Sequence, residues 1–249
     1  MTGTLIFTHI PKTAGTSLKK SAIFPNVPRD RIYWVQGVRK LIQDRPRDAQ
    51  VVLGHFPYGA HMVLGRGPFH YLTILRDPVD RAVSFYNYVL LCEQGNPAHP
   101  GHYAWHPALP DAKRYPIDQF YEIEAYRNVQ TKFTAGYLWD RPRNALPRWA
   151  RETLVPESRL LQRAQENLLQ RYWYFGLLDR IDEAQDTIAQ ALGGVNAEVR
   201  DVSRQTSGSA GRVDPTPQQR ARIRELNALD VALVDFAAEH YDRQVVAPL

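Results

Sequence analysis

Short apolar runs alternate along this chain with longer segments in which apolar residues recur at helical spacing. Four of the runs are typical of strands buried on both faces of a sheet: residues 5–10, 51–53, 71–75 and 172–178. Helical spacing follows these runs over residues 13–23, 78–91 and 181–192. Strands that alternate with helices in this way predict an α/β fold, with a mostly parallel central sheet flanked by helices.

The rest of the chain is predicted to contain helices and two long loops. Further helical patterns cover residues 117–124, 128–135 and 157–170. Pro215 begins a long amphipathic helix that ends near Tyr241. Residues 95–116 are rich in Pro, His, Gly and aromatic side chains without a sustained period, which indicates a loop. Residues 203–213 are interpreted as a second, polar and mobile loop.

Length and charge limit the classes of protein that fit. With 249 residues, 44% of them apolar, and no internal repeat, the chain is expected to form one domain over residues 1–249. Lys and Arg number 31 against 26 Asp and Glu, a net charge of +5 that favours anionic ligands. Because no run of five or six like charges occurs, nucleic acid is not expected as a partner.

Cysteine content and the chain start bear on compartment and metal. The single Cys92 cannot form an internal disulfide, which suits a reducing compartment. No cysteine pair or His-Glu-x-x-His spacing offers a zinc site, so no metal is expected. No signal peptide is recognised, and no apolar stretch approaches the roughly twenty residues that cross a bilayer. A cytoplasmic protein is therefore expected.

The turn after the first strand is predicted to bind a phosphate group. It contains Pro11, Lys12, Thr13, Ala14, Gly15, Thr16 and Ser17. Gly15 permits close approach of the backbone, Thr16 and Ser17 add hydroxyl groups, and the following helix presents its amides. Lys12 supplies a positive charge, but it precedes Gly15 by three residues, whereas the lysine of a Walker loop follows the final glycine. This difference disfavours ATP hydrolysis as the function. An ordinary strand-to-helix turn with a surface lysine is the alternative.

A second anion-binding element is predicted where the third strand ends. Arg76 follows that strand and can bind a phosphate through two parallel hydrogen bonds, and Ser84, two turns into the next helix, adds a hydroxyl. Asp77 and Pro78 are the expected N-cap and first residue of this helix. The alternatives are an ion pair between Arg76 and Asp80, and a helix-surface role for Ser84.

These two segments resemble the sulfotransferases that use 3′-phosphoadenosine 5′-phosphosulfate (PAPS). Residues 9–18 resemble the 5′-phosphosulfate loop of that family, particularly of the branch with the Golgi heparan and chondroitin sulfotransferases, and residues 71–86 resemble its 3′-phosphate segment. Weaker similarity extends to residues 128–133, to residues 174–177 and to the end of the chain, so the resemblance covers most of its length. The resemblance implies the P-loop-like sulfotransferase fold and transfer of a sulfuryl group from PAPS to a hydroxyl by in-line displacement. Because no membrane anchor is recognised in the sequence, a bacterial-type member is expected.

The resemblance also implies roles for individual residues. The donor nucleotide would be bound by residues 11–17 with Arg76 and Ser84, and by Arg204 and Arg212 from the loop over residues 203–213. Lys12 would stabilise charge on the leaving group. His55 follows a strand at Gly54, in a segment that resembles the one supplying the general base in heparan 2-O-sulfotransferases. A histidine hydrogen-bonded at the core boundary is the alternative, and His9 is expected to be structural.

The acceptor is expected to be a hydroxyl compound. The resemblance favours a carbohydrate, and the hydroxyl of a lipid, a polyketide or a peptide is the alternative. Besides His55, the residues expected to line its site are aromatic: Tyr58, Tyr86, Tyr103 and Trp105. Such rings stack against sugars or pack onto the core. His99, His102 and His106 lie in the long loop, where they meet the acceptor or face water.

Two other functions fit part of the pattern. A nucleotide or small-molecule kinase would share the sheet, the phosphate loop and the basic residues, but it needs an acidic residue at a strand end to hold magnesium. The nearest acid, Asp77, is better interpreted as a helix cap. A catalytically inactive module that binds a nucleotide or a glycan is the second alternative, and the presence of both Lys12 and His55 argues against it.

Overall fold

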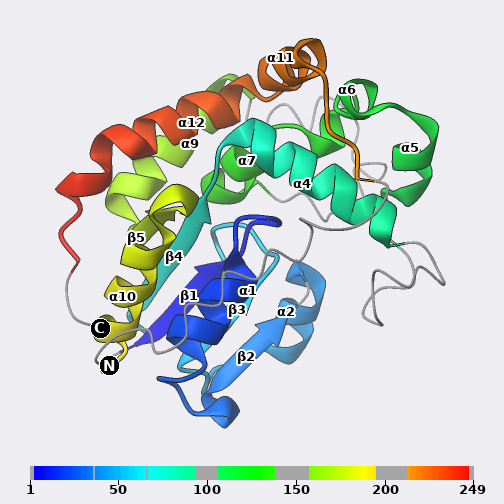
Figure 1. Cartoon of the computed structure of the whole chain (residues 1–249). Coiled ribbons are helices and arrows are strands. Elements are labelled where there is room, and N and C mark those ends of the chain that lie inside the picture. The colour runs from blue at the N-terminus through cyan, green and yellow to red at the C-terminus, as the bar shows by residue number, and fades with distance from the viewer. Residues whose placement is uncertain are drawn as a thin grey trace.

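Five parallel strands form the central sheet of the computed structural model, which describes residues 3–35, 37–65, 67–92, 106–137, 157–194 and 212–246 (Figure 1). The strands are β1 Thr4–Thr8, β2 Ile32–Val35, β3 Val51–Gly54, β4 Phe69–Leu75 and β5 Tyr172–Leu177. Their order across the sheet is β2-β3-β1-β4-β5, and every neighbouring pair is parallel. The predicted α/β architecture is confirmed.

Strand boundaries follow the pairing partners. β1 ends at Thr8, two residues before the predicted end, because its partner β3 ends at Gly54 opposite Thr8. β2 was not predicted, since its four residues are too few to show a period. It lies at the sheet edge, where Trp34 is 54% exposed.

Helices connect the strands. The described helices are α1 Gly15–Leu18, α2 Val38–Asp44, α3 His61–Leu64, α4 Pro78–Leu91, α5 Leu109–Arg114, α6 Ile117–Phe120, α7 Val129–Ala135, α9 Glu157–Gln170, α10 Ile181–Ala191, α11 Pro217–Leu226 and α12 Ala228–His240. α1 continues as a π-helical segment, Lys19–Ile23, and short 3₁₀ turns lie at Arg29–Arg31, Glu124–Tyr126, Leu178–Arg180 and Tyr241–Arg243. As predicted, Asp77 caps α4: its side chain accepts from the amide of Asp80 at 2.8 Å. In the described ranges, no helix is both long enough and apolar enough to span a membrane.

The predicted long C-terminal helix is two helices. A capping box of Thr216 and Gln219 begins α11, and Asn227 separates α11 from α12. The buried side chain of Asn227 accepts a hydrogen bond from the Asn128 amide at 3.0 Å. This contact across 99 residues leaves no trace in the local apolar pattern, which runs through the break.

Both predicted loops fall largely outside the described residues. Residues 93–105 and 195–211 are not described. Within the predicted loop over residues 95–116, however, α5 is a helix, so that part of the prediction was wrong. Of the loop over residues 203–213, only Arg212 and Val213 are described.

Alternation along the strands divides the core between the two faces of the sheet. Leu5 and Phe7 of β1 pack with α1, its π-helical extension and α10 on one face, whereas Ile6 packs with α7, α9 and α12 on the other. A third apolar cluster joins α4, α5, α6 and α11 beyond the carboxyl ends of the strands. Helices therefore cover both faces, and the loops after the strands are held between them.

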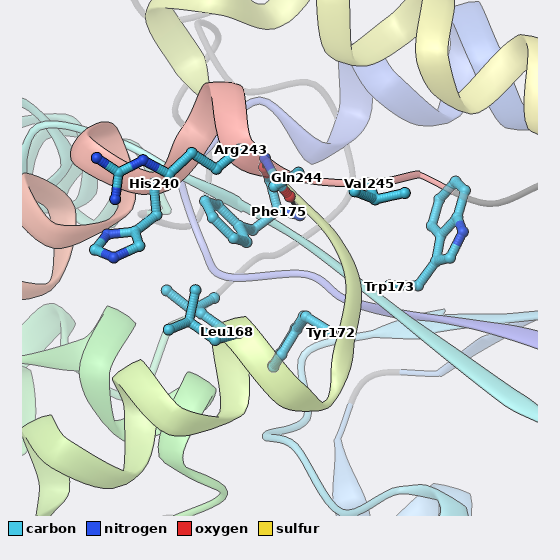
Figure 2. A pocket seen from close by; sticks show the side chains of 9 residues that line it. Leu168, Tyr172, Trp173, Phe175, His240, Arg243, Gln244 and Val245 are labelled. Carbon is cyan, nitrogen blue, oxygen red and sulfur yellow. Dashed lines mark hydrogen bonds between the residues drawn. The ribbon is translucent and has the colours of Figure 1, made fainter.

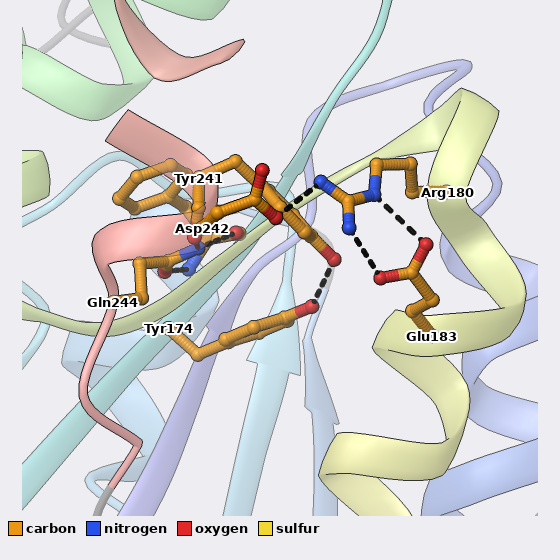
Figure 3. A network of polar contacts seen from close by, with 7 residues as sticks. Tyr174, Arg180, Glu183, Tyr241, Asp242 and Gln244 are labelled. Carbon is orange, nitrogen blue, oxygen red and sulfur yellow. Dashed lines mark hydrogen bonds and ion pairs between the residues drawn. The ribbon is translucent and has the colours of Figure 1, made fainter. Parts of the chain in front are cut away.

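The C-terminal segment after α12 is bonded to the edge strand β5 and to the turn that follows it (Figure 3). The guanidinium of Arg180 binds Glu183 and Asp242 at 2.7 Å each and lies over the Tyr241 ring. The side-chain amide of Gln244 pairs with both backbone polar groups of Phe175 in β5. Because β5 is an edge strand, this contact satisfies part of its open edge.

Candidate functional site

Three predicted site residues meet at one edge of the sheet. Lys12, His55 and Arg76 follow the carboxyl ends of β1, β3 and β4, which are neighbours in the sheet. In a parallel sheet these ends lie on the same side, where ligands are commonly bound. A direct contact joins two of the loops: Nη1 of Arg76 donates to the carbonyl oxygen of Lys12 at 3.1 Å.

The Lys12 loop has an unusual backbone. Lys12 and Ala14 adopt left-handed conformations, with φ of 70° and 60°, although neither is glycine. Such residues cost energy and are concentrated at functional sites, where the turn directs backbone amides to one point. Leu18 makes the first helical hydrogen bond, to Ala14, so the amides of residues 15–17 precede the helical ladder. Loops that bind anions often have a backbone of this kind.

The hydroxyl of Thr13 forms a hydrogen bond within the loop. Thr13 is fully buried and its Oγ1 donates to the carbonyl of Ile10 at 2.9 Å, which closes the turn. The Thr13 side chain thus stabilises the loop, while Thr16 and Ser17 lie in the first turn of α1.

Gly15 is required by a neighbouring histidine. A Cβ atom at position 15 would lie 2.1 Å from Cδ2 and Nε2 of His9. The buried His9 ring stacks on Phe7 and lies 4.5 Å from the His55 ring, centroid to centroid. Burial and then the charge of His55 hold the pKa of His9 well below its usual value, so the ring is neutral. His9 is a packing residue under the loop, in agreement with its expected structural role.

We expect Gly15→Ala to distort the loop. Overpacking of a tight contact costs about 1–3 kcal/mol, which corresponds to a nucleotide affinity weaker by roughly five- to 150-fold when the loop shifts to relieve the clash. Isothermal calorimetry with adenosine 3′,5′-bisphosphate measures this. The double variant His9→Ala/Gly15→Ala removes the clashing ring and should recover part of the loss. Unchanged affinity in the single variant would contradict the expectation.

Lys12 is a partly desolvated cation. Its Nζ lies 4.6 Å from the centroid of the Tyr88 ring. Burial, and after it the charge of Arg76, lower the pKa of Lys12 to about 8. An ammonium that has lost much of its hydration and lies beside a second cation gains strongly from an anion bound between them.

The hydrogen bond of His55 determines which of its ring nitrogens is basic. Nδ1 of His55 lies 2.7 Å from the carbonyl oxygen of His9. Because a carbonyl only accepts, Nδ1 carries the proton, and in the neutral ring Nε2 is the nitrogen with the lone pair. A neutral imidazole held in this tautomer is suited to accept a proton.

Arg76 is held by its backbone as well as by its side chain. The side-chain amide of Gln130 accepts from the Arg76 amide at 2.9 Å and donates to its carbonyl at 2.8 Å. Asp80, the alternative partner of Arg76, forms its ion pair with Arg220 at 2.7 Å. Ser84 lies further along α4 and is 9% exposed.

Arg212 is held near the carboxyl ends of the strands by its neighbour Val213. Val213 exchanges two hydrogen bonds with the side chain of Asn87 in α4, at 2.8 and 2.9 Å. Burial is the main cause that lowers the pKa of Arg76, and the charge of Arg212 contributes a smaller lowering, so the two guanidinium groups lie within electrostatic reach. Arg204 lies outside the described residues.

The predicted acceptor residues do not all lie at the site. Tyr86 is buried, and its hydroxyl donates to the carbonyls of Ala112 and Tyr115. It therefore packs in the core, which was the alternative to a place in the acceptor site. Tyr58 packs among Tyr71 and Tyr172. Tyr103 and Trp105 lie outside the described residues, as do His99 and His102.

Of two residues near Lys12, Tyr88 was not predicted, and His106 was named only as a loop histidine that meets the acceptor or faces water. Tyr88 contacts Lys12, and its place four residues after Ser84, on the same helical face, was the available signal. The His106 ring meets Tyr88 edge-on at 6.0 Å. Its Nδ1 accepts from the Ala108 amide, so Nε2 carries the proton. Burial and then the charge of His55 lower the pKa of His106, which places the two histidines near each other.

A cavity of about 320 Å³ lies elsewhere (Figure 2). It is lined by Leu168, Leu169, Tyr172, Trp173, Phe175, His240, Arg243, Gln244 and Val245. None of Lys12, His55 and Arg76 contributes to it.

Within the described ranges, histidine, cysteine and carboxylate side chains do not gather in groups of three that could hold a metal ion.

A search against models of known protein families found no match for this chain, and a search of curated proteins found none either. A functional assignment therefore depends on the residues of the chain and their geometry.

Proposed function

We propose that this protein is a sulfotransferase that moves a sulfuryl group from PAPS to a hydroxyl acceptor. The observation that carries the proposal is the hydrogen bond from Arg76 to the carbonyl of Lys12, which joins the two loops that are predicted to bind anions. One doubly phosphorylated nucleotide could then contact both: its 5′-phosphosulfate at the Lys12 loop and its 3′-phosphate at Arg76. His55 lies at the same edge with a basic Nε2.

The proposed reaction is an in-line displacement. Nε2 of His55 accepts the proton of the acceptor hydroxyl as the acceptor oxygen forms a bond to sulfur. The bond from sulfur to the 5′-phosphate oxygen breaks, and its electron pair remains on that oxygen. Lys12 stabilises the charge that develops there, and adenosine 3′,5′-bisphosphate is released. A positioned base and a preorganised cation are what a loose transition state of this kind requires.

A carbohydrate hydroxyl is the proposed acceptor, and this part rests on the family resemblance of the two loops. The ring of Tyr88 contacts Lys12 and is a candidate to pack against such an acceptor. His106, with its proton on Nε2, supplies a hydrogen-bond donor beside it.

We expect Arg76→Ala to weaken nucleotide binding more than it slows turnover. Charge-assisted hydrogen bonds to a phosphate are worth about 1.5–3 kcal/mol, so the Kd for adenosine 3′,5′-bisphosphate should rise roughly ten- to hundredfold. Calorimetry gives the Kd, and steady-state kinetics separate the KM for PAPS from kcat. Arg180→Ala removes an arginine that binds Glu183 and Asp242 and lies over the Tyr241 ring, and it should leave both unchanged.

One assay tests the function as a whole. Radiolabelled PAPS is offered with panels of sugars, lipids and phenols, and Lys12→Ala serves as the blank. Label transfer to one class supports the proposal and identifies the acceptor. Phosphoryl transfer from ATP with magnesium, and none from PAPS, would indicate a kinase instead. No affinity of the wild-type protein for adenosine 3′,5′-bisphosphate would overturn the proposal.

A further inference from the structure

A buried polar network lies behind Arg76. The network links Asp230 at the start of α12 to Gln130 in the first turn of α7, and Gln130 to Arg76, which follows β4. Gln130 and Asp230 are both 0% exposed. Buried polar groups are costly unless fully hydrogen-bonded, so a network in this position indicates a specific geometric requirement.

The side chain of Gln130 makes the hydrogen bonds to the Arg76 backbone that a neighbouring strand would make inside the sheet. The pairing of β4 with β5 ends at Leu75 opposite Leu177, and the pairing of β4 with β1 ends earlier, at Leu72. The backbone of Arg76 therefore lies beyond the sheet. The single amide of Gln130 satisfies both its N–H and its C=O, which fixes the peptide groups on either side of the Cα atom. The direction of the Arg76 side chain depends on that backbone.

Asp230 in turn fixes Gln130. Its carboxylate accepts from the amides of Gln130 and Thr131, at 3.2 and 2.8 Å, and from Oγ1 of Thr131 at 2.8 Å. A carboxylate at the start of α7 is also stabilised by the helix dipole. Oδ1 of Asn128 accepts from the Asp230 amide at 3.3 Å. The beginnings of α7 and α12 are thereby locked together.

We propose that Gln130, held by Asp230, is a positioning residue that sets the Arg76 guanidinium for the 3′-phosphate of the nucleotide. This inference rests on the proposed function and extends it: the affinity for the 3′-phosphate is coupled to the packing of α7 against α12. A guanidinium held in advance by its backbone and by the Lys12 carbonyl loses little conformational freedom on binding.

The test compares adenosine 3′,5′-bisphosphate with adenosine 5′-phosphate, which lacks the 3′-phosphate. In the wild-type protein the bisphosphate should bind more tightly. Gln130→Leu should reduce this preference about tenfold, while the affinity for adenosine 5′-phosphate changes little. Gln130→Glu keeps the shape and an acceptor for the Arg76 amide but turns a carboxylate towards the Arg76 carbonyl, and it should have a similar effect. In both variants KM for PAPS should rise more than kcat falls.

Gln185 provides a matched control. It is also 0% exposed, on α10, and neither its Nε2 nor its Oε1 has a hydrogen-bond partner. Gln185→Leu therefore makes the same chemical change in the core without a link to Arg76, and its preference for the bisphosphate should equal that of the wild type. If Gln130→Leu and Gln185→Leu both lost the preference for the bisphosphate, the effect would be merely structural and the inference would be overturned.

Hydrogen exchange of the wild-type protein gives a reading that needs no variant. The bisphosphate, but not adenosine 5′-phosphate, should slow exchange at the amides of Gln130 and Thr131. Equal protection by both ligands, or full preference retained in a folded Gln130 variant, would overturn the inference alone. A wild-type protein that binds both nucleotides equally would instead overturn the proposed role of Arg76 and, with it, the proposed function.

Discussion

Lys12→Ala is expected to lower kcat by about 10²–10³-fold, the loss that follows removal of one preorganised group from a developing negative charge. The reason is the position of Lys12 in a left-handed turn beside Arg76, where its ammonium is largely desolvated before a ligand arrives. Steady-state kinetics with PAPS and the acceptor found in the screen measure the effect. Lys40→Ala removes an exposed lysine bonded to Asp44 and should change nothing.

The pH profile distinguishes loss of charge from loss of shape. The pKa of Lys12 is lowered to about 8, so the free enzyme carries the positive charge below that pH and loses it above. The value of kcat/KM for PAPS, which reports the free enzyme, should therefore fall by about tenfold per pH unit above pH 8. Lys12→Arg keeps its charge at every accessible pH and should lack this decline. A Lys12→Ala enzyme with wild-type turnover would exclude Lys12 from the chemistry.

His55→Ala is the second variant with a large expected effect. Loss of a general base lowers turnover by about 10²–10⁴-fold. The hydrogen bond from Nδ1 to the His9 carbonyl presents Nε2 as the basic nitrogen, so the alanine variant loses the proton acceptor. Added imidazole should restore part of the rate if the cavity left by the ring admits it. Calorimetry should show nearly unchanged nucleotide affinity.

His240 is the control for His55. Its Nδ1 lies 2.9 Å from the carbonyl of Phe236, the same arrangement as in His55, but it lines the cavity beside β5. His240→Ala should therefore retain wild-type turnover. Equal activity of the His55→Ala enzyme and the wild type would remove the base assignment and leave His55 as a core-boundary residue.

Elements with strong local signals were predicted well. The period of residues 78–91 and the cap formed by Asp77 and Pro78 predicted α4 with its observed ends, and residues 157–170 predicted α9. Short elements were missed: β2 has four residues, and α5 has six within a segment rich in Pro and His. A window of four to six residues spans fewer than two helical turns, so periodicity carries little information there.

The candidate site was predicted in part. Lys12, His55 and Arg76 could be placed together because each follows a strand and all parallel strands end at the same edge. Tyr86 could not be placed, since an aromatic residue on an amphipathic helix suits a core as well as a ligand site. Gln130 was seen only as part of a weakly similar segment, and nothing in its neighbourhood pointed to Arg76.

The sequence by itself determined the alternation of strands and helices, the parallel sheet and the three loops that carry basic side chains, because these depend on contacts between near neighbours and on the burial of apolar faces. Only the tertiary structure decided how those side chains are held. The bonds of Gln130 to Arg76 span 54 residues, and those of Asp230 to Gln130 and Thr131 span about 100. A hydrogen bond between distant residues imposes no period and no spacing on the chain, so it becomes visible only when the fold brings its partners together.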